Sequence, residues 1–227
     1  MIEILHEDNH CLVVNKPAGC PTQPDSSGDP CLEALVRADL KRRYKKPGNV
    51  YLGLIHRLDR PTSGALLLAK TSKAAARLSS QSRDGRITKT YWAIVEGHVQ
   101  PETGIWLDEI LPGESGHSMK VVKSGTPGAR SAETRYRILD EKDGLTLLEL
   151  TLVTGRKHQI RLQCSSRGHP VLGDLRYGSK RRLDASDGGA RIALHAREIR
   201  FNHPTREEAI SVTAPAPADW PGVFALQ

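Results

Sequence analysis

Aromatic residues are scarce in this sequence, at only 4% of the chain. We therefore do not expect a binding surface built from rows of bases stacked on aromatic side chains. No apolar run approaches the roughly 20 residues that a membrane-spanning helix needs. The opening residues, MIEILHEDNH, lack the basic and apolar regions of a secretory signal. We therefore expect a cytoplasmic protein with no membrane partner.

Cysteine is also sparse, and its spacing forms no C-x-x-C pair. In a reducing compartment such cysteines are expected to be free thiols. A metal site built from His6, His10 and Cys11 is conceivable, but no second ligand cluster has matching spacing. The chain also has no glycine-rich phosphate-binding motif. We therefore predict no metal and no cofactor. The four cysteines are Cys11, Cys20, Cys31 and Cys164.

Positive charge is in excess, with 33 Lys+Arg against 26 Asp+Glu, a formal net charge of +7. Such a balance favours a polyanionic partner, although an ordinary basic protein whose cations only solvate its surface gives the same total. Clustering shifts the balance toward a nucleic acid. Three groups of cations stand out: residues 37–46, residues 156–161 and residues 180–182.

The pattern of apolar residues predicts an α+β protein, with 1–227 as a single domain. Leu32, Leu35, Val36 and Leu40 fall on one helical face, and the run GALLLA at 64–69 is typical of a strand buried on both faces. Strands outnumber helices without βαβ alternation, which favours a mixed, mostly antiparallel sheet with flanking helices and loops. Further expected elements are strands on either side of 7–10, a helix from Thr71 or Ser72 to about 82, a strand ending at 97, short irregular strands over 101–128, a hairpin turning at 141–144, a helix after 155 and a strand over 191–201.

The stretch GLIHRLDRPTSGALLLAKT, Gly53 to Thr71, places Asp59 between Arg57 and Arg60. A surface ion pair would explain this, at well under about 1 kcal/mol. An active-site acid held ionised beside an anionic substrate would also explain it. A Ser63–His56–Asp59 triad fits poorly, because the three lie within eight residues of one extended piece. No second acid suggests a glycosidase pair. A lone acid among cations suggests a carboxylate nucleophile acting on a nucleic-acid component.

The same stretch closely resembles the signature of the RluA family of pseudouridine synthases, in which HRLD is followed by TSG, an apolar strand and AK. Four further segments resemble the family in the family's order: ILHEDNHCLVVNKPAG, KTYWAIVEG, TGRKHQIRLQ, and the pair GHPVLGDLRYG and LHAREIRFNHP. The resemblance spans about 2–204. It implies the pseudouridine synthase fold, with a catalytic cleft across the sheet.

The resemblance implies an isomerase that converts particular uridines in structured RNA to pseudouridine without metal, cofactor or energy source. Asp59 matches the catalytic aspartate, Tyr91 the active-site tyrosine that packs on the base, and Arg161 the cation that pairs with the aspartate. Arg57 matches a residue that can fill the gap left when the uridine is flipped out of the helix. Other residues expected to contact the substrate are His56, Leu194, Arg156 and Lys89.

Two departures from the family matter. Many relatives carry an S4-type RNA-binding domain ahead of the catalytic part, whereas the motifs here begin at residue 2, so RNA affinity is expected to come from the catalytic domain. The motif HQIR-x often continues with histidine, where this chain has Gln163.

Ribosomal RNA and transfer RNA are both open as substrates. We expect a monomer with no obligate protein partner. Two rival functions remain: a catalytically silent RNA-binding or RNA-chaperone protein of the same fold, and a glycosidase-like or hydrolytic enzyme acting on nucleosides. The three matched residues Asp59, Tyr91 and Arg161 argue against the silent protein, since a pure binder needs no carboxylate among its cations.

Overall fold

The structure, a computed structural model, describes residues 2–113, 118–183 and 191–224. The chain divides into two compact units. The first comprises Met1–Lys89 and Ala196–Pro215, and the second comprises Thr90–His195 and Ala216–Gln227. The prediction of a single domain over 1–227 stays a prediction. No helix among the described residues is long and apolar enough to cross a membrane.

The first unit is built on a set of neighbouring strands. The pairings of β1 with β2, β2 with β4, β3 with β4 and β10 with β11 are antiparallel. The pair of strands predicted around residues 7–10 is confirmed as β1 and β2. In sheet order the strands are β1 (Glu3–Glu7), β2 (Cys11–Lys16), β4 (Ser63–Ala69) and most of β10 (Leu194–Asn202), with β3 (Gly53–Leu54) on β4 and β11 (Ala209–Thr213) on β10.

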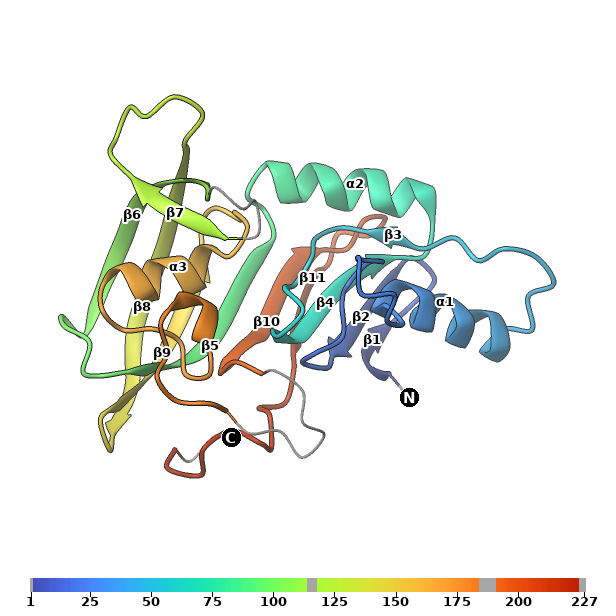
Figure 1. Cartoon of the computed structure of the whole chain (residues 1–227). Coiled ribbons are helices and arrows are strands. Elements are labelled where there is room, and N and C mark those ends of the chain that lie inside the picture. Colours follow the sequence, from blue (N-terminus) through green and yellow to red (C-terminus); the bar gives the residue numbers. More distant parts are fainter. Residues whose placement is uncertain (1, 114–117, 184–190, 225–227) are drawn as a thin grey trace. The chain divides into compact units, whose positions relative to one another are not determined.

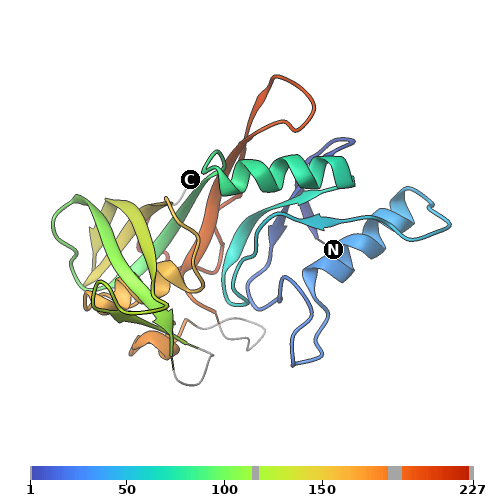
Figure 2. The ribbon, with the colours of Figure 1, turned by 90° about the horizontal axis from the view of Figure 1, so that it is seen from above.

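Helix α2 (Ser72–Arg83) covers one face of these strands, and Figure 1 shows it running along β3 and β4. The predicted cap is confirmed, since the Thr71 side chain accepts a hydrogen bond from the backbone N–H of Ala74 at 3.2 Å. Buried Ala74 and Leu78 pack in one cluster with alternate residues of β2 and β4. The β10–β11 hairpin crosses α2 near the end of the helix (Figure 2), where the Gln81 side-chain amide donates to the Asn202 carbonyl and accepts from the Asn202 N–H.

Helix α1 (Leu32–Arg43) confirms the predicted helix but corrects one of its residues. Leu32, Val36 and Leu40 are buried, whereas Leu35, expected on the same face, is 39% exposed. At 3.6 residues per turn Leu35 lies roughly 100° from the centre of the stripe that the other three form. The apolar face of α1 is therefore narrower than the sequence suggested.

The second unit contains a run of antiparallel strands. The predicted hairpin is confirmed as β8 and β9, and its turn residues Asp143 and Gly144 both have positive φ, at 55° and 70°. Helix α3 contacts β7 and the short helix η1. In sheet order the strands are β5 (Thr88–Glu96), β9 (Leu145–Leu152), β8 (Arg130–Lys142), β6 (Thr103–Pro112) and β7 (Met119–Val122), and the helices are α3 (Gln159–Ser166) and η1 (Leu175–Tyr177).

Two sequence expectations are corrected in this unit. The segment 101–128 was expected to hold only short irregular strands, but β6 is ten residues long. The expectation came from the raised glycine and proline content of the segment, but one of these glycines, Gly104, makes room for the Tyr136 ring, since a Cβ there would lie 2.7 Å from it. The helix expected after Gly155 begins only at Gln159, because His158 is left-handed, with φ of 55°. The whole set of elements confirms a mostly antiparallel α+β fold.

Candidate active site

Asp59 lies in the loop that joins β3 to β4, in the first unit. Its neighbour Leu58 is buried, and one hydroxyl fixes both ends of that residue's backbone. Thr22 Oγ1 donates to the Leu58 carbonyl at 2.8 Å and accepts from the Leu58 N–H at 3.3 Å. The Asp59 carbonyl in turn accepts from the Thr62 N–H at 3.0 Å. Leu58 thus points into the protein, as predicted, and the turn is anchored on both sides of the acid.

Lys16 supports the same loop through hydrogen bonds from its side-chain ammonium group. It ends β2 and is 0% exposed. Its Nζ donates to the carbonyls of Pro17 at 3.0 Å, Cys20 at 2.7 Å and Arg60 at 3.1 Å, so each ammonium proton has an acceptor. Burial lowers the pKa of Lys16 to about 8, while the nearby Asp59 carboxylate acts in the opposite direction. A buried cation therefore lies within electrostatic reach of the candidate nucleophile.

The two arginines that flank Asp59 in the sequence have different surroundings. Arg60 donates from Nε to the Gly19 carbonyl at 3.0 Å and forms ion pairs with Asp25 and Asp29. The Gly19 N–H returns a bond to the Arg60 carbonyl at 2.8 Å. Arg57 is exposed. Arg60 therefore ties the loop to residues 19–29, whereas Arg57 lies where a substrate can reach it.

His56 enters the loop as a structural acceptor. Its Nε2 accepts the backbone N–H of Leu67 at 3.1 Å, and its Nδ1 is buried without a hydrogen-bond partner. Burial, followed by the charge of Lys89, lowers the pKa of His56 to about 3. Burial also lowers the pKa of Lys89. His56 is therefore neutral at physiological pH, and the substrate contacts expected of His56 and Lys89 stay predictions.

Gly64 permits the sharp exit from the loop into β4. Its φ is +112°, a conformation that side chains rarely adopt, and a Cβ there would lie 2.3 Å from the backbone oxygen of Ala196. The glycine of the TSG segment is thus required both by conformation and by close approach.

In the second unit, Arg161 is the third residue of α3 and is only 4% exposed. Its Nε donates to Oδ2 of Asp174 at 2.6 Å, and its Nη2 donates to Oδ1 at 2.8 Å. This is a two-point contact between a guanidinium and a carboxylate. The guanidinium also lies over the Tyr177 ring, 5.1 Å from its centre. The pairing of Arg161 with Asp59 that the resemblance implies stays a prediction.

The remaining predicted residues lie at defined places in the second unit. Tyr91 is buried in β5, opposite Leu150 of β9. Leu194 is the buried first residue of β10. Arg156 donates from Nε to the Ser131 carbonyl at 3.0 Å. Asp59 belongs to the first unit and these residues belong to the second.

Gln163, where the family often has histidine, fastens α3 to the strands beneath it. Its Oε1 accepts from Thr134 Oγ1 at 2.6 Å, and its Nε2 donates to Asp108 at 2.9 Å and to the Ala132 carbonyl at 3.1 Å. The residue is fully buried. Gln163 therefore has a structural role that the motif comparison did not suggest.

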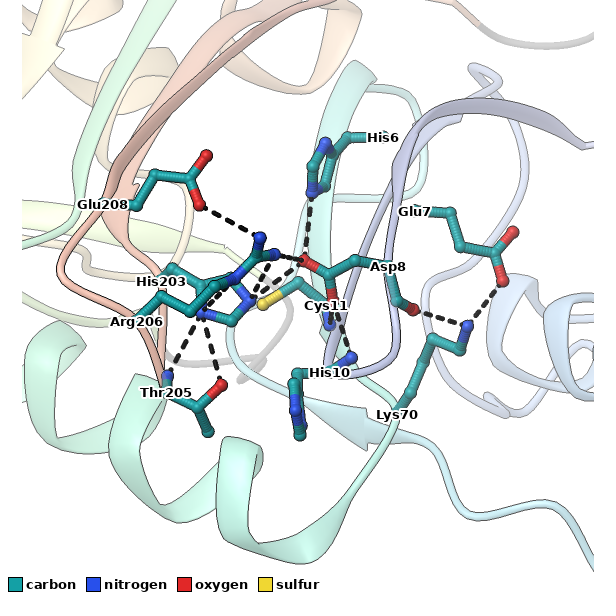
Figure 3. Close-up of polar contacts among 10 residues, drawn as sticks. All are labelled: His6, Glu7, Asp8, His10, Cys11, Lys70, His203, Thr205, Arg206 and Glu208. Atoms are coloured by element: carbon teal, nitrogen blue, oxygen red, sulfur yellow. Dashed lines mark hydrogen bonds and ion pairs between the residues drawn. The ribbon is translucent and has the colours of Figure 1, made fainter.

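One cluster in the first unit has the residue types of a metal site: Asp8, Cys11 and His203 (Figure 3). Asp8 Oδ2 lies 3.0 Å from His203 Nε2 and 3.3 Å from a nitrogen of Arg206. The backbone N–H of Thr205 donates to His203 Nδ1 at 3.2 Å, so Nε2 carries the proton. The Arg206 cation and this proton both oppose a metal ion, and the cluster is better described as a hydrogen-bonded network.

The model of a protein family described as RNA pseudouridylate synthase matches residues 10–166 of this chain. The chain belongs to the RNA pseudouridylate synthase family. The match contains Asp59, Tyr91 and Arg161, so the three residues singled out by motif all lie within the region that defines membership of the family. Asp174 and Leu194 lie beyond it.

Members of the pseudouridylate synthase family resemble the chain along most of its length. It is 38% identical over 95% of its residues to a ribosomal large subunit pseudouridine synthase C of Vibrio cholerae, covering 66% of that protein. It is 37% identical over 96% of its residues to an uncharacterized RNA pseudouridine synthase of Bacillus subtilis, covering 70% of that protein. The chain thus spans about two thirds of the length of these curated relatives.

A solved family structure confirms the fold. Human RNA pseudouridylate synthase domain containing 4 superposes with a TM-score of 0.78 and 28% identity, covering 95% of this chain and 89% of that one. Two residues of the site escaped the sequence argument, Lys16 and Asp174. Lys16 lies in NKPAG and Asp174 lies in GDLRYG, two segments that resemble the family. The sequence of these segments does not indicate that either side chain is buried.

Proposed function

We propose that this chain is an RNA pseudouridine synthase, an isomerase that converts specific uridines in structured RNA to pseudouridine. The observation that carries the proposal is the Asp59 loop. Its backbone is held on both sides of the acid by Thr22, Lys16 and Gly19, in a chain of the pseudouridylate synthase family. Such anchoring is the preorganisation that a nucleophile needs.

In the proposed reaction, the Asp59 carboxylate attacks the target nucleotide or assists cleavage of the bond between N1 of uracil and C1′ of ribose. The freed uracil turns within the pocket, and C5 forms the new bond to C1′ while N1 takes up a proton. Where Asp59 has bonded to the nucleotide, that bond breaks before the product leaves, and the carboxylate is regenerated. The proton on C5 is then lost, and Tyr91 is suited to that transfer. Arg161 is proposed to orient the carboxylate and favour its ionised form. Leu194 would supply an apolar wall for the base.

The RNA is proposed to bind through the excess of cations. Arg37, Arg42 and Arg43 of α1 are paired with acidic side chains, whereas Lys41, Lys45 and Lys46 have no ion pair among the described residues. These lysines are the better candidates for phosphate contacts. Exposed Arg57 is proposed to occupy the gap left by the flipped uridine.

Ribosomal RNA is the first substrate to test, because the Vibrio cholerae relative is named a ribosomal large subunit pseudouridine synthase. Transfer RNA is the second. The rival function, a silent RNA-binding protein, would leave unexplained why so many contacts fix a loop that carries an acid among cations.

The decisive test is Asp59→Asn, which keeps the size of the side chain but removes the nucleophile. We expect the variant to fold, to bind RNA at least as tightly as the wild type, and to form no detectable pseudouridine. The measurement is tritium release from RNA labelled at uridine C5, beside a thermal melt and a binding titration. A structural acid would instead cost about 1–3 kcal/mol of stability and leave activity in the folded fraction.

Two outcomes would contradict the proposal. A folded Asp59→Asn protein that releases tritium at nearly the wild-type rate would remove Asp59 from the chemistry. Free uracil among the products of the wild type, without pseudouridine, would favour the hydrolytic alternative. If neither outcome is observed, pseudouridine mapping of total RNA from cells with and without the gene identifies the modified positions.

A further inference from the structure

Asp174 holds one edge of the Arg161 guanidinium. The Nε and Nη2 donors of Arg161 both point at this carboxylate, at 2.6 and 2.8 Å. Arginine has five N–H donors in a planar fork. A second acid approaching Arg161 must therefore use the other edge, the one that includes Nη1. The contact with Asp174 thus selects the direction in which Arg161 can serve another group.

The position of Asp174 is itself fixed by its backbone. Its N–H donates to the Val171 carbonyl at 2.9 Å, and its own carbonyl accepts from the N–H groups of Tyr177 at 3.0 Å and Ser179 at 3.1 Å. The preceding Gly173 has φ of +86°, and a Cβ there would lie 2.5 Å from the Arg191 carbonyl oxygen. The carboxylate therefore projects from a turn that has little freedom to adjust.

A third group supports the guanidinium from its face. The Tyr177 ring lies 5.1 Å from the Arg161 guanidinium carbon, an arrangement that attracts a cation. Tyr177 is held in turn, because its hydroxyl accepts from the Met119 N–H at 2.9 Å and contacts His158 Nδ1 at 2.8 Å. Ser165 of α3 donates to the Tyr177 carbonyl at 2.6 Å. Helix η1 and α3 thus form one support for Arg161.

We infer that Asp174 is a positioning residue for the isomerisation, acting through Arg161. It matches the charge of a buried guanidinium and fixes the orientation in which that group meets the reacting carboxylate. The pair is almost fully buried, with side-chain exposures of 5% for Arg161 and 1% for Asp174, so solvent cannot take over either task. This inference rests on the proposed function, which assigns Arg161 a role.

The test compares two substitutions that each remove a carboxylate bound to an arginine of the α3 region. Asp174→Asn releases Arg161. The matched control, Asp108→Asn, alters the contacts of the same Asp108 oxygen with Arg167 and with Gln163, both at 2.9 Å, and so disturbs the support of α3 without touching Arg161. For Asp174→Asn we expect the single-turnover rate per folded molecule to fall about tenfold or more, since a displacement of about 1 Å can cost a hundredfold. We expect RNA affinity to stay near that of the wild type, and Asp108→Asn to keep its rate.

A second readout does not depend on activity. In protein labelled with ¹⁵N on arginine, the Nε–H of Arg161 should exchange slowly with water, because it is buried and bonded. Its signal is assigned by its loss in Arg161→Lys. We expect the slow signal to persist in Asp108→Asn and to broaden or disappear in Asp174→Asn. Should Asp174→Asn not fold, Asp174→Glu keeps the buried charge but displaces the guanidinium, and it should still lose rate.

The outcomes separate the positioning role of Asp174 from the proposed function of the chain. Equal rates per folded molecule in the Asp174 and Asp108 variants would overturn the positioning role, as would an unchanged Arg161 signal in Asp174→Asn. A wild type that forms no pseudouridine would refute the proposed function alone, and the arginine signal would still show whether Asp174 fixes Arg161.

Discussion

The Asp59 loop and the Arg161 site are held in opposite ways. Around Asp59 the contacts from Thr22, Lys16 and Gly19 all engage main-chain atoms of the neighbouring residues. Around Arg161 the principal contact engages the charged head of the side chain itself, through Asp174. One region is fixed by its backbone and the other by its functional group.

The difference follows from what each group is proposed to do. A carboxylate that attacks the substrate is placed by the chain that carries it, and the backbone contacts on either side of Asp59 fix that chain. A guanidinium carries five N–H donors along more than one edge. One edge can be fixed while another serves the reaction. Backbone support should therefore be the more sensitive part of the site.

The largest effect is expected for Lys16→Met, which would break the backbone support. Methionine has a similar length but donates no hydrogen bond, so three carbonyls lose the ammonium donor and the Arg60 carbonyl keeps only the Gly19 N–H. The Asp59 loop is thereby loosened. We expect the single-turnover rate per folded molecule to fall about tenfold to a hundredfold. The measurement is tritium release corrected for the folded fraction, which a thermal melt provides.

Lys73→Met, at an exposed position of α2, is the control for this change. It should leave both rate and melting temperature near the wild type. A Lys16→Met protein with the full rate would show that the reaction does not need the backbone support of Asp59. The two regions would then not differ in the way proposed here.

A smaller loss of rate, which depends on the substrate, is expected for Arg57→Ala. Arg57 is exposed and lies next to the anchored backbone of the Asp59 loop. Leaving the base stack costs a few kcal/mol, and a stacked guanidinium offsets part of that cost. The variant should modify a structured stem–loop far more slowly than the wild type does, while its rate on a short unstructured fragment should change little. Equal losses on both substrates would indicate that Arg57 holds the loop or a phosphate instead.

The last expected effect leaves the rate at neutral pH unchanged and concerns stability at low pH. Burial lowers the pKa of His56 to about 3, so between that value and its ordinary pKa the unfolded chain binds more protons than the folded one. The contribution of neutral His56 to stability is therefore complete above about pH 6.5 and is lost as the pH falls toward 3, by roughly 3–5 kcal/mol in total.

His56→Gln tests this expectation, since glutamine can also accept the Leu67 N–H but does not titrate. Urea unfolding of both proteins at several pH values between 4 and 7 gives the difference. We expect the wild type to lose stability faster than the variant as the pH falls. Parallel curves would mean that the imidazole is protonated in the folded protein.

The sequence predicted those parts of the fold that depend on local pattern. The run GALLLA marked a strand buried on both faces, because only apolar residues tolerate that position, and β4 is such a strand. Thr71 marked a helix start because its hydroxyl can bond the first turn. The position of Asp59 beside the inward-pointing Leu58 followed from the alternation of side chains along an extended chain.

The supports of the site could not be predicted in the same way. A lysine at the end of a strand and an aspartate after a glycine are both typical of surfaces. Their burial depends on partners distant in sequence: Lys16 bonds the carbonyl of Arg60, and Asp174 binds Arg161. The long strand β6 was missed for a related reason, since Gly104 weakens the pattern but makes room for Tyr136.

The burial of Lys16 makes this residue a natural reporter of loop opening. Amine-directed reagents modify lysines that meet solvent, and the ammonium of Lys16 is enclosed by three carbonyl groups. Its labelling must therefore wait until residues 16–20 separate from residue 60. In a time course followed by mass spectrometry, the slow modification of Lys16 would measure how often the Asp59 loop leaves its support, and bound RNA would change that frequency.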